Sequence, residues 1–210
     1  MQWLTEKVYN GRNLVCISNK YLFVKRCMDI LLSVIGLIIG IPLMIIAIIC
    51  IVLESRGNPI YSQMRVGLNN VEFKMYKLRS MKANAEVNGA QWAKKNDSRI
   101  TKVGKFIRKT RIDEIPQLFN ILKGDMSIIG PRPEREVFYK EFEKNIPGFR
   151  ERLSVKPGLT GYAQVNGGYE LEPEEKLNLD LFYIKNQSLK LDLYIIFKTF
   201  GVLFTGEGAR

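Results

Sequence analysis

The sequence predicts an α+β fold that is mainly helical, with an N-terminal re-entrant membrane helix hairpin, a β-hairpin, and amphipathic interfacial helices around a cytosolic core. Three features predict this fold: an uncharged apolar run, two β-prone segments joined by a turn, and apolar residues at helical spacing farther along the chain. We expect a basic N-terminal segment over residues 1–29, the membrane helix over residues 30–53, and a cytosolic and interfacial domain over residues 54–210.

The apolar run over residues 30–53 would measure about 36 Å as a straight helix, which is long enough to cross a bilayer. Basic residues lie on both sides of it, so a spanning helix would place one basic flank outside the cell, against the positive-inside tendency. Gly40 and Pro42 lie at the midpoint, where a proline bends or breaks a helix. A re-entrant hairpin broken at Pro42 satisfies both observations, whereas a proline-kinked spanning helix is the alternative that composition leaves open.

After the run, the segments GNPIYSQMRVG and VEFKMYKLRSM are β-prone, and the turn-forming GLNN joins them, which predicts a β-hairpin. Residues 83–98 are polar and irregular and predict a helix fragment and a loop. Residues 94–111 then carry eight Lys or Arg and a single acid, Asp97. This basic segment is either a solvated face or a contact with anionic lipid.

The stretch RKTRIDEIPQLFN, residues 108–120, places two adjacent carboxylates, Asp113 and Glu114, among cations. Apolar spacing from Ile112 onward predicts a helix, and Pro116, which is tolerated only in a first turn, sets its start close to Asp113. Asp113 is suited there to an N-cap. The local pattern favours this cap, and the alternative is a nucleophile that accepts a phosphoryl group, if cations and a divalent metal neutralise the phosphate. The local pattern leaves both interpretations open.

Three later segments add candidate elements. In GDMSIIGPRPE, two prolines restrict the backbone around Arg132, which indicates either a preorganised anion contact or a rigid surface loop. The glycine-rich VKPGLTGYAQVNGG, residues 155–168, predicts a loop with room for close backbone approach to a ligand. Residues 189–204 predict an amphipathic helix that lies in the membrane interface or packs on the core.

Composition restricts the chemistry. The 210 residues include 32 Lys and Arg against 21 Asp and Glu, a net charge of +11, which favours nucleic acid, anionic lipid or a phosphorylated substrate as partner. The absence of histidine excludes Ser-His and Cys-His nucleophile arrangements and most zinc sites. The three cysteines show no Cys-x-x-Cys spacing, which indicates a reducing compartment without a disulfide framework.

Taken in order, KRCMDILLS, YKLRSM, RITKVGKFIRKTRIDEIPQLFNILKGDMSIIGPRP and VKPGLTGYAQVNG closely resemble the bacterial sugar transferases, which are monotopic polyprenyl-phosphate phosphoglycosyl transferases. The resemblance covers roughly residues 20–205 and implies the small, minimal form of the family, without the additional N-terminal transmembrane helices of larger relatives. It makes residues 54–210 the catalytic domain and implies a re-entrant helix centred on Pro42.

The same resemblance implies transfer of a sugar 1-phosphate from a UDP-sugar to undecaprenyl phosphate. The reaction would release UMP and form an undecaprenyl-diphosphate-sugar through a covalent aspartyl phosphosugar intermediate. It would initiate polysaccharide, capsule or glycoconjugate assembly at the cytoplasmic face of the bacterial inner membrane. Membrane lipid and downstream glycosyltransferases would be partners, and no nucleic acid is expected.

The resemblance also assigns residues. Asp113 would be the nucleophile, and Glu114 would help to position Mg²⁺ or activate the acceptor phosphate, so that both carboxylates are candidate metal ligands. Candidate phosphate contacts are Arg108, Arg132, Lys77 and Arg79. Two positions depart from the family pattern, because Gly168 stands where many members have arginine and Ile41 where serine often precedes the proline. The competing hypothesis is a non-catalytic membrane adaptor that holds anionic lipid or nucleic acid, with Asp113 as a helix cap.

Overall fold

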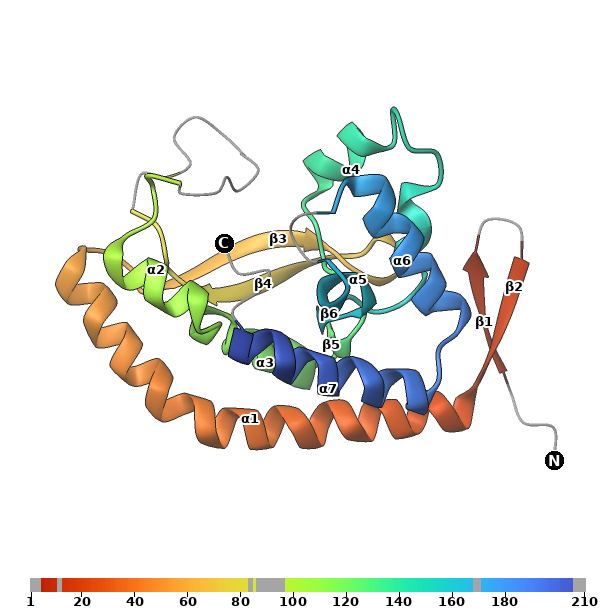
Figure 1. The fold of residues 1–210 in the computed structure, drawn as a ribbon, viewed down its shortest axis with the longest axis horizontal. Coiled ribbons are helices and arrows are strands. Elements are labelled where there is room, and N and C mark those ends of the chain that lie inside the picture. The colour runs from red at the N-terminus through yellow and green to blue at the C-terminus, as the bar shows by residue number, and fades with distance from the viewer. Residues whose placement is uncertain (1–4, 11–12, 83–84, 86–96, 168–170, 206–210) are drawn as a thin grey trace.

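The computed structural model describes residues 5–10, 13–82, 85, 97–167 and 171–205 (Figure 1). In chain order, the strands and helices are β1 (Thr5–Asn10), β2 (Asn13–Ser18), α1 (Asn19–Glu54), β3 (Ile60–Val66), β4 (Glu72–Leu78), α2 (Lys102–Lys109), α3 (Gln117–Lys123), β5 (Ser127–Ile129), α4 (Glu136–Phe142), β6 (Gly158–Thr160), α5 (Tyr162–Val165), α6 (Pro173–Lys185) and α7 (Leu189–Thr205). Short 3-10 turns η1 (Leu68–Asn70), η2 (Ile112–Glu114) and η3 (Phe149–Ser154) connect them. The prediction of a mainly helical α+β protein is confirmed.

Helix α1 is continuous from Asn19 to Glu54 and contains Pro42, so the predicted break into a hairpin at that residue is not confirmed. The helix bends instead, and its axis changes direction along the molecule (Figure 1). A proline removes one hydrogen bond and displaces one carbonyl, whereas the bonds on either side of it can continue the helix. The helix also begins well before residue 30, inside the predicted basic segment.

Polar residues on one face of α1 explain this early start. Lys25 bonds the Asp192 carboxylate of α7 at 3.2 Å and the Tyr183 hydroxyl of α6 at 3.1 Å. One turn on, the buried Asp29 accepts hydrogen bonds from the Ser127 hydroxyl at 2.9 Å and from a backbone N–H of β5 at 2.8 Å. Residues four apart share a helix face, so the polar first third of α1 packs against the domain.

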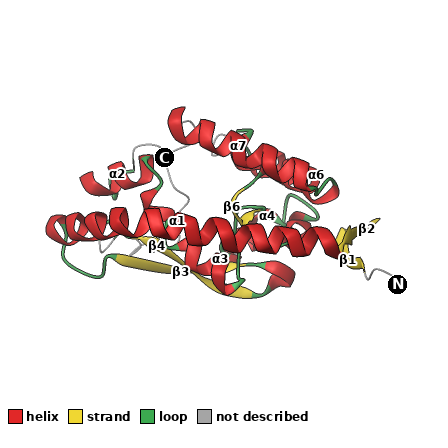
Figure 2. Cartoon of the chain, turned by 90° about the horizontal axis from the view of Figure 1, so that it is seen from below, coloured by secondary structure: helices red, strands yellow, loops and turns green. Residues whose placement is uncertain are grey.

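The rest of α1 packs through apolar contacts. A Cβ on Gly36 would lie 2.9 Å from Leu118, and one on Gly40 would lie 2.9 Å from Ile115, so both glycines allow close approach of the segment that contains α3. Ala47 and Ile51 then join a core cluster with Leu78 of β4 and Ile107 of α2. The partly buried residues that pack against this cluster are Met44, Ile48, Val103 and Ile112. At the end of the helix, the Glu54 carboxylate accepts hydrogen bonds from the first N–H groups of α2, at 2.7 and 2.9 Å. Helix α1 therefore contacts the domain along its whole length (Figure 2).

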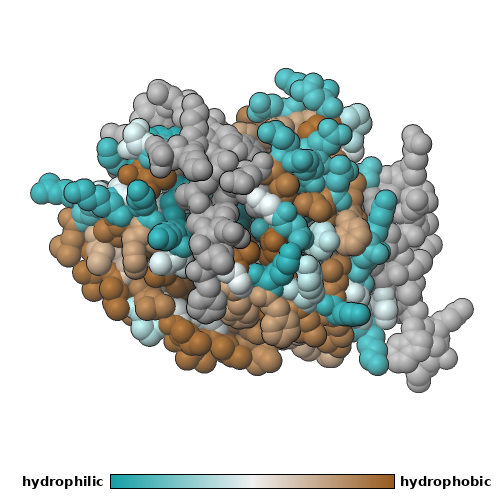
Figure 3. Space-filling model, viewed as in Figure 1, coloured by the Kyte–Doolittle hydropathy of each residue, from teal (hydrophilic) through white to brown (hydrophobic). Residues whose placement is uncertain are grey.

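The opposite face of α1 is exposed and apolar. Its exposed large hydrophobic residues include Leu31, Val34, Ile38, Ile39, Ile45, Ile46, Ile49 and Leu53. In the space-filling view, hydrophobic residues gather along the lower edge, where Figure 1 draws α1 (Figure 3). Among the described residues, α1 is the helix that is long and apolar enough to cross a membrane by length and composition. Exposed apolar surface of this extent marks a membrane or protein contact.

The predicted β-hairpin is confirmed, because β3 and β4 pair antiparallel from Ile60 opposite Leu78 to Val66 opposite Glu72. Asn120 of α3 fixes β4 in place: its side chain accepts from the Tyr76 N–H at 3.1 Å and donates to the Lys74 carbonyl at 2.8 Å. The N-terminal hairpin of β1 and β2 was not predicted. Most of the predicted loop over residues 83–98, and Gly168, lie outside the described residues.

The glycine-rich segment departs from its prediction. Strands β5 and β6 pair in parallel, and a Cβ on Gly158 would lie 2.1 Å from the backbone nitrogen of Gly130. A Cβ on Gly161 would lie 2.2 Å from the Gly130 carbonyl oxygen. These glycines therefore allow backbone to pack on backbone, where the sequence predicted backbone approach to a ligand. Helix α7 is confirmed as a helix; it buries Asp192 and Ile195 while leaving Phe197 and Phe200 exposed.

Candidate active site

The acidic pair lies in η2, between α2 and α3. Arg111 precedes it with φ +59°, a left-handed conformation that is uncommon for a residue with a side chain and is often found at functional sites. Arg111 follows the C-cap residue of α2, Thr110, and is the N-cap residue of η2. Helix α3 begins only at Gln117, with Pro116 as its N-cap residue and no side-chain cap. The interpretation of Asp113 as the cap of this helix is therefore wrong.

Glu114 is buried and is bound by two cations from other parts of the chain. Its Oε1 accepts from Lys77 Nζ of β4 at 3.0 Å and from Arg132 Nη2 of the Pro-Arg-Pro loop at 2.5 Å. Burial opposes ionisation of this carboxyl, but Arg132 and Lys77 outweigh burial and hold its pKa well below the ordinary value. Glu114 is therefore a fixed negative charge between two cations.

Asp113 is buried next to Glu114 in a different environment. Its Oδ1 is inaccessible to solvent and has no hydrogen-bond partner among the described residues. Burial raises the pKa of Asp113 to about 6, and the negative charge of Glu114 acts in the same direction, against Lys77, Arg108 and Arg111. The adjacent carboxylates thus have pKa values displaced in opposite directions, which is a pattern of acid and base sites in enzymes.

The structure brings together four of the predicted site residues: Asp113, Glu114, Lys77 and Arg132. Arg108, in the last turn of α2, contributes positive charge near Asp113. Arg79 is not part of this group. Its guanidinium donates to the backbone oxygens of Ser55 at 2.5 Å and Arg56 at 3.1 Å, just past the end of α1. Strand β4 ends at Leu78. Arg79 lies beyond the strand, so its side chain does not point in the same direction as that of Lys77.

Two residues that the sequence did not indicate hold the Pro-Arg-Pro loop. Arg152 Nη2 donates to the Arg132 carbonyl oxygen at 3.1 Å and pairs with Asp180 of α6 at 2.6 Å, and both side chains of this pair are almost fully buried. On the other side of the loop, Arg65 of β3 donates to the Pro133 carbonyl oxygen at 3.1 Å. Removal of either partner of the buried Arg152–Asp180 pair would leave an uncompensated charge. This pair and the Arg65 contact together fix the backbone from which Arg132 reaches Glu114.

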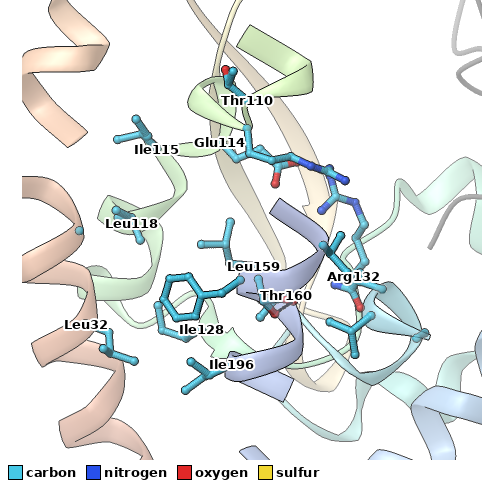
Figure 4. Close-up of a pocket in the computed structure, with 18 of the residues that line it drawn as sticks. Leu32, Thr110, Glu114, Ile115, Leu118, Ile128, Arg132, Leu159, Thr160 and Ile196 are labelled. Carbon is cyan, nitrogen blue, oxygen red and sulfur yellow. Dashed lines mark hydrogen bonds and ion pairs between the residues drawn. The ribbon is translucent and has the colours of Figure 1, made fainter. Parts of the chain in front are cut away.

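A cavity of about 540 Å³ lies beside the pair (Figure 4). Its walls come mainly from α1, α3, α7 and the β5–β6 region, and Glu114, Arg111 and Arg132 lie at one end. Figure 4 shows Leu32 of α1 and Ile196 of α7 on the side of the cavity away from Glu114. Asp113 does not line it. The cavity therefore joins an apolar interior to a charged end.

The described residues contain no cluster of three or more Asp, Glu, Cys or His side chains that could hold a metal ion. The pair itself still fits a hard divalent cation, because Mg²⁺ usually takes only one or two protein carboxylates and keeps its other ligands from water or phosphate. Asp113 Oδ1 has no competing partner, whereas Glu114 Oε1 already accepts from two cations. Of the two predicted ligands, Asp113 is the better fit.

The structure combines a long apolar helix, packed on a small α+β domain, with a buried acidic pair between cations, as is expected of a membrane-associated protein. Comparison with known protein families identifies the family. Residues 20–206 match the bacterial sugar transferase family, and the chain belongs to that family. The family predicted from the sequence motifs is thereby confirmed.

Several relatives are similar over most of this chain. The UDP-N-acetylgalactosamine-undecaprenyl-phosphate N-acetylgalactosaminephosphotransferase of Aeromonas hydrophila is 50% identical over 193 residues, which cover 90% of this chain and 46% of the relative. A Bacillus subtilis protein, provisionally named an undecaprenyl-phosphate N-acetylgalactosaminyl 1-phosphate transferase, is 58% identical over 134 residues, 64% of this chain and 75% of that protein. The undecaprenyl-phosphate galactose phosphotransferase of Salmonella typhimurium is 42% identical over 202 residues, 89% and 42% of the two chains. The chain spans less than half the length of the Aeromonas and Salmonella relatives.

Proposed function

We propose that the protein transfers a sugar 1-phosphate from a UDP-sugar to undecaprenyl phosphate, releasing UMP and forming an undecaprenyl-diphosphate-sugar. The observation that carries the proposal is the geometry of the pair: Asp113 has a buried, unbonded carboxylate oxygen, and the adjacent Glu114 is bound by Lys77 and Arg132. The names of the relatives support both substrates.

In the first step, an Asp113 oxygen attacks the phosphorus that carries the sugar. A new P–O bond forms to the carboxylate, the P–O bond to UMP breaks, and UMP leaves with the electron pair. In the second step, a phosphate oxygen of the acceptor attacks the same phosphorus and Asp113 leaves as carboxylate. A pKa of about 6 keeps Asp113 mostly ionised at neutral pH while making it more basic, and hence more nucleophilic, than an exposed aspartate.

The cations have separate parts in these steps. Arg108 and Lys77 place positive charge near Asp113, where the transferred phosphoryl group carries its negative charge. Arg132 holds Glu114 and supplies a guanidinium for the acceptor phosphate. Asp113 and Glu114 would hold Mg²⁺, which when bound supplies further neutralisation of phosphate charge.

The donor that we propose is a UDP-N-acetylhexosamine, with UDP-N-acetylgalactosamine as the first choice. N-acetylgalactosamine is the sugar in the names of the two relatives described above that are at least 50% identical to this chain. The lipid-linked product would start a polysaccharide or glycoconjugate, and glycosyltransferases that extend lipid-linked sugars would consume it.

The proposed function is tested by UMP release. Membranes containing the protein are incubated with undecaprenyl phosphate, Mg²⁺ and each member of a UDP-sugar panel, and UMP and the lipid product are measured. We expect UMP and a lipid-linked sugar in equal amounts, with UDP-N-acetylgalactosamine as the best donor. Membranes lacking the protein are the control. The absence of UMP with every donor would rule out the proposal.

We also propose that the protein lies on the cytoplasmic face of the bacterial inner membrane and enters it from one side only. Lys25 near the start of α1 binds Asp192 of the domain, and Glu54 at its end binds the backbone of α2 in the same domain. A helix that crossed the bilayer would have to give up one of these sets of contacts. Instead, the exposed apolar face between them would enter the bilayer while both ends stay with the domain.

Cysteine labelling tests this topology. In a variant with its native cysteines replaced by serine, Lys20→Cys and Arg56→Cys place thiols at exposed positions on the two ends of α1. We expect that a membrane-impermeant maleimide added to intact cells labels neither position, and that it labels both after permeabilisation. Labelling of one position alone in intact cells would show a spanning helix.

A further inference from the structure

We infer that the cavity between α1 and α7 binds the hydrocarbon chain of the lipid phosphate acceptor, with the acceptor phosphate at the charged end beside Glu114. The inference rests on the proposed function, since it assigns a place to the acceptor of that reaction. The proposed occupant of the cavity is a lipid phosphate, and the sugar nucleotide does not bind in it.

The chemistry of the walls supports a hydrocarbon occupant. Five elements supply most of the apolar lining: Leu32, Ile35 and Ile39 from α1, Ile196, Phe200 and Val202 from α7, Leu118 from α3, Ile128 from β5 and Leu159 from β6. Figure 4 shows the labelled members of this set around one space. The neutral polar residues of the lining are Thr110, Thr160, Gln164 and Thr199. Against the nine apolar side chains, a uridine or sugar ring would bury hydrogen-bonding groups without partners, which is unfavourable, whereas a hydrocarbon chain would not.

The charged end supports a phosphate on that hydrocarbon. The charged lining residues are the carboxylates of Glu114 and Glu134 and the cations Arg111, Arg132, Arg152 and Lys176. Lys77 also binds Glu114 from β4, so cations outnumber carboxylates around the cavity. An apolar cavity that ends in a cationic group matches an amphiphile with an anionic head. Glu114 is adjacent in sequence to Asp113, so a phosphate bound there lies close to the group that Asp113 would carry.

The cavity also reaches the surface that would face the bilayer. Three of its lining residues are largely exposed: Ile35 at 44%, Ile39 at 65% and Phe200 at 55%. Ile35 and Ile39 also belong to the exposed apolar face of α1, and Phe200 lies on α7. A chain could thus pass from the bilayer into the cavity without crossing water. A long polyprenyl chain exceeds the cavity volume of about 540 Å³, so only the part nearest the phosphate would lie inside.

Two adjacent isoleucines provide a matched test. Ile39 lines the cavity and is 65% exposed, whereas Ile38 is 68% exposed and does not line it. Ile39→Trp should narrow the cavity, and Ile38→Trp should add the same bulk outside it. With the best donor, we expect Ile39→Trp to raise the KM for undecaprenyl phosphate at least about tenfold, the effect of about 1.4 kcal/mol of lost binding. Ile38→Trp should leave this KM within twofold.

A second readout separates acceptor from donor. UMP released in a single turnover without acceptor reports the donor step alone, and we expect it to be unchanged in both variants. If the wild-type protein releases no UMP with any donor, the proposed function fails. If the wild type is active but the two variants have the same acceptor KM, or if Ile39→Trp loses the acceptor-independent step, the inference is overturned. Should Ile39→Trp fail to accumulate, Val202→Trp on the opposite wall takes its place.

Discussion

Replacement of Asp113 by asparagine is expected to lower transfer at least about 10⁴-fold, because a neutral amide cannot replace the carboxylate as the nucleophile that forms the covalent bond to the phosphosugar. Asparagine has nearly the same shape, and Oδ1 of Asp113 makes no hydrogen bond among the described residues that the change would break. The measurement is the rate of UMP release in purified membranes, at matched protein levels. Activity within tenfold of the wild type would exclude Asp113 as the nucleophile.

The stability of this variant has a defined pH dependence. Burial raises the pKa of Asp113 from 3.8 to about 6, so the folded protein binds this proton more tightly than the unfolded chain does. Folding is therefore favoured by this group below about pH 4, and that contribution is lost as the pH rises to about 6. Asparagine does not titrate. On going from pH 4 to pH 8, the stability of Asp113→Asn relative to wild type should rise, by roughly 3 kcal/mol at most.

Thermal unfolding in detergent at the two pH values measures this change. A cost of burying the asparagine amide would be the same at both pH values and would cancel in the comparison. A relative stability that falls from pH 4 to pH 8 would instead indicate that ionised Asp113 stabilises the fold through contacts, as a structural residue does.

The second large effect is expected for Arg132→Ala, which should lower kcat/KM about 10²–10³-fold, the range for loss of one charge-stabilising donor in an active site. Arg132 binds Glu114 at 2.5 Å, so its removal leaves Lys77 as the remaining hydrogen-bonded cation of Glu114 and raises the pKa of that carboxyl. Arg132→Lys should be intermediate, because lysine keeps the charge and loses the planar fork.

The control for Arg132 is Lys140→Ala, which removes a cation from an exposed position on α4 with a weak contact of 3.9 Å to Glu136. It should leave kcat/KM unchanged. Both variants are compared at several salt concentrations, because a nonspecific effect of net charge would be screened by salt and would affect both alike. Equal losses in Arg132→Ala and Lys140→Ala would refute a specific role for Arg132.

Local patterns in the sequence were sufficient for several elements. The β3–β4 hairpin followed from β-prone segments around a turn, and the helical spacing after Pro116 was right. The N-terminal hairpin was overlooked, although Asn10-Gly11 between two β-prone segments is a recognised turn signal. The start of the helix near Asp113 was wrong because one apolar period spans both η2 and α3, and periodicity does not show where a 3-10 turn changes to an α-helix.

Long-range pairing limited the rest. In the sequence, Lys25 and Asp29 look like polar residues that flank the apolar run. In the structure they lie within α1, because Asp192 and Ser127, which are far away in sequence, bind their side chains. The same limit hid Arg152, whose role depends on Asp180 and on the Arg132 carbonyl oxygen. Lys77 and Arg79 are indistinguishable in YKLRSM, and only the end of β4 at Leu78 separates the residue at the acidic pair from the one at the end of α1.

The central claim is that Asp113 carries the phosphosugar, and intact-protein mass spectrometry tests it most directly. Wild-type protein and Asp113→Asn are incubated with UDP-N-acetylgalactosamine and Mg²⁺ in the absence of acceptor, then quenched rapidly. The account predicts that the wild type gains the mass of one sugar phosphate together with stoichiometric UMP, that Asp113→Asn gains none, and that added undecaprenyl phosphate removes the adduct. UMP release that requires the acceptor, with no adduct on the wild-type protein under any quench, would contradict it.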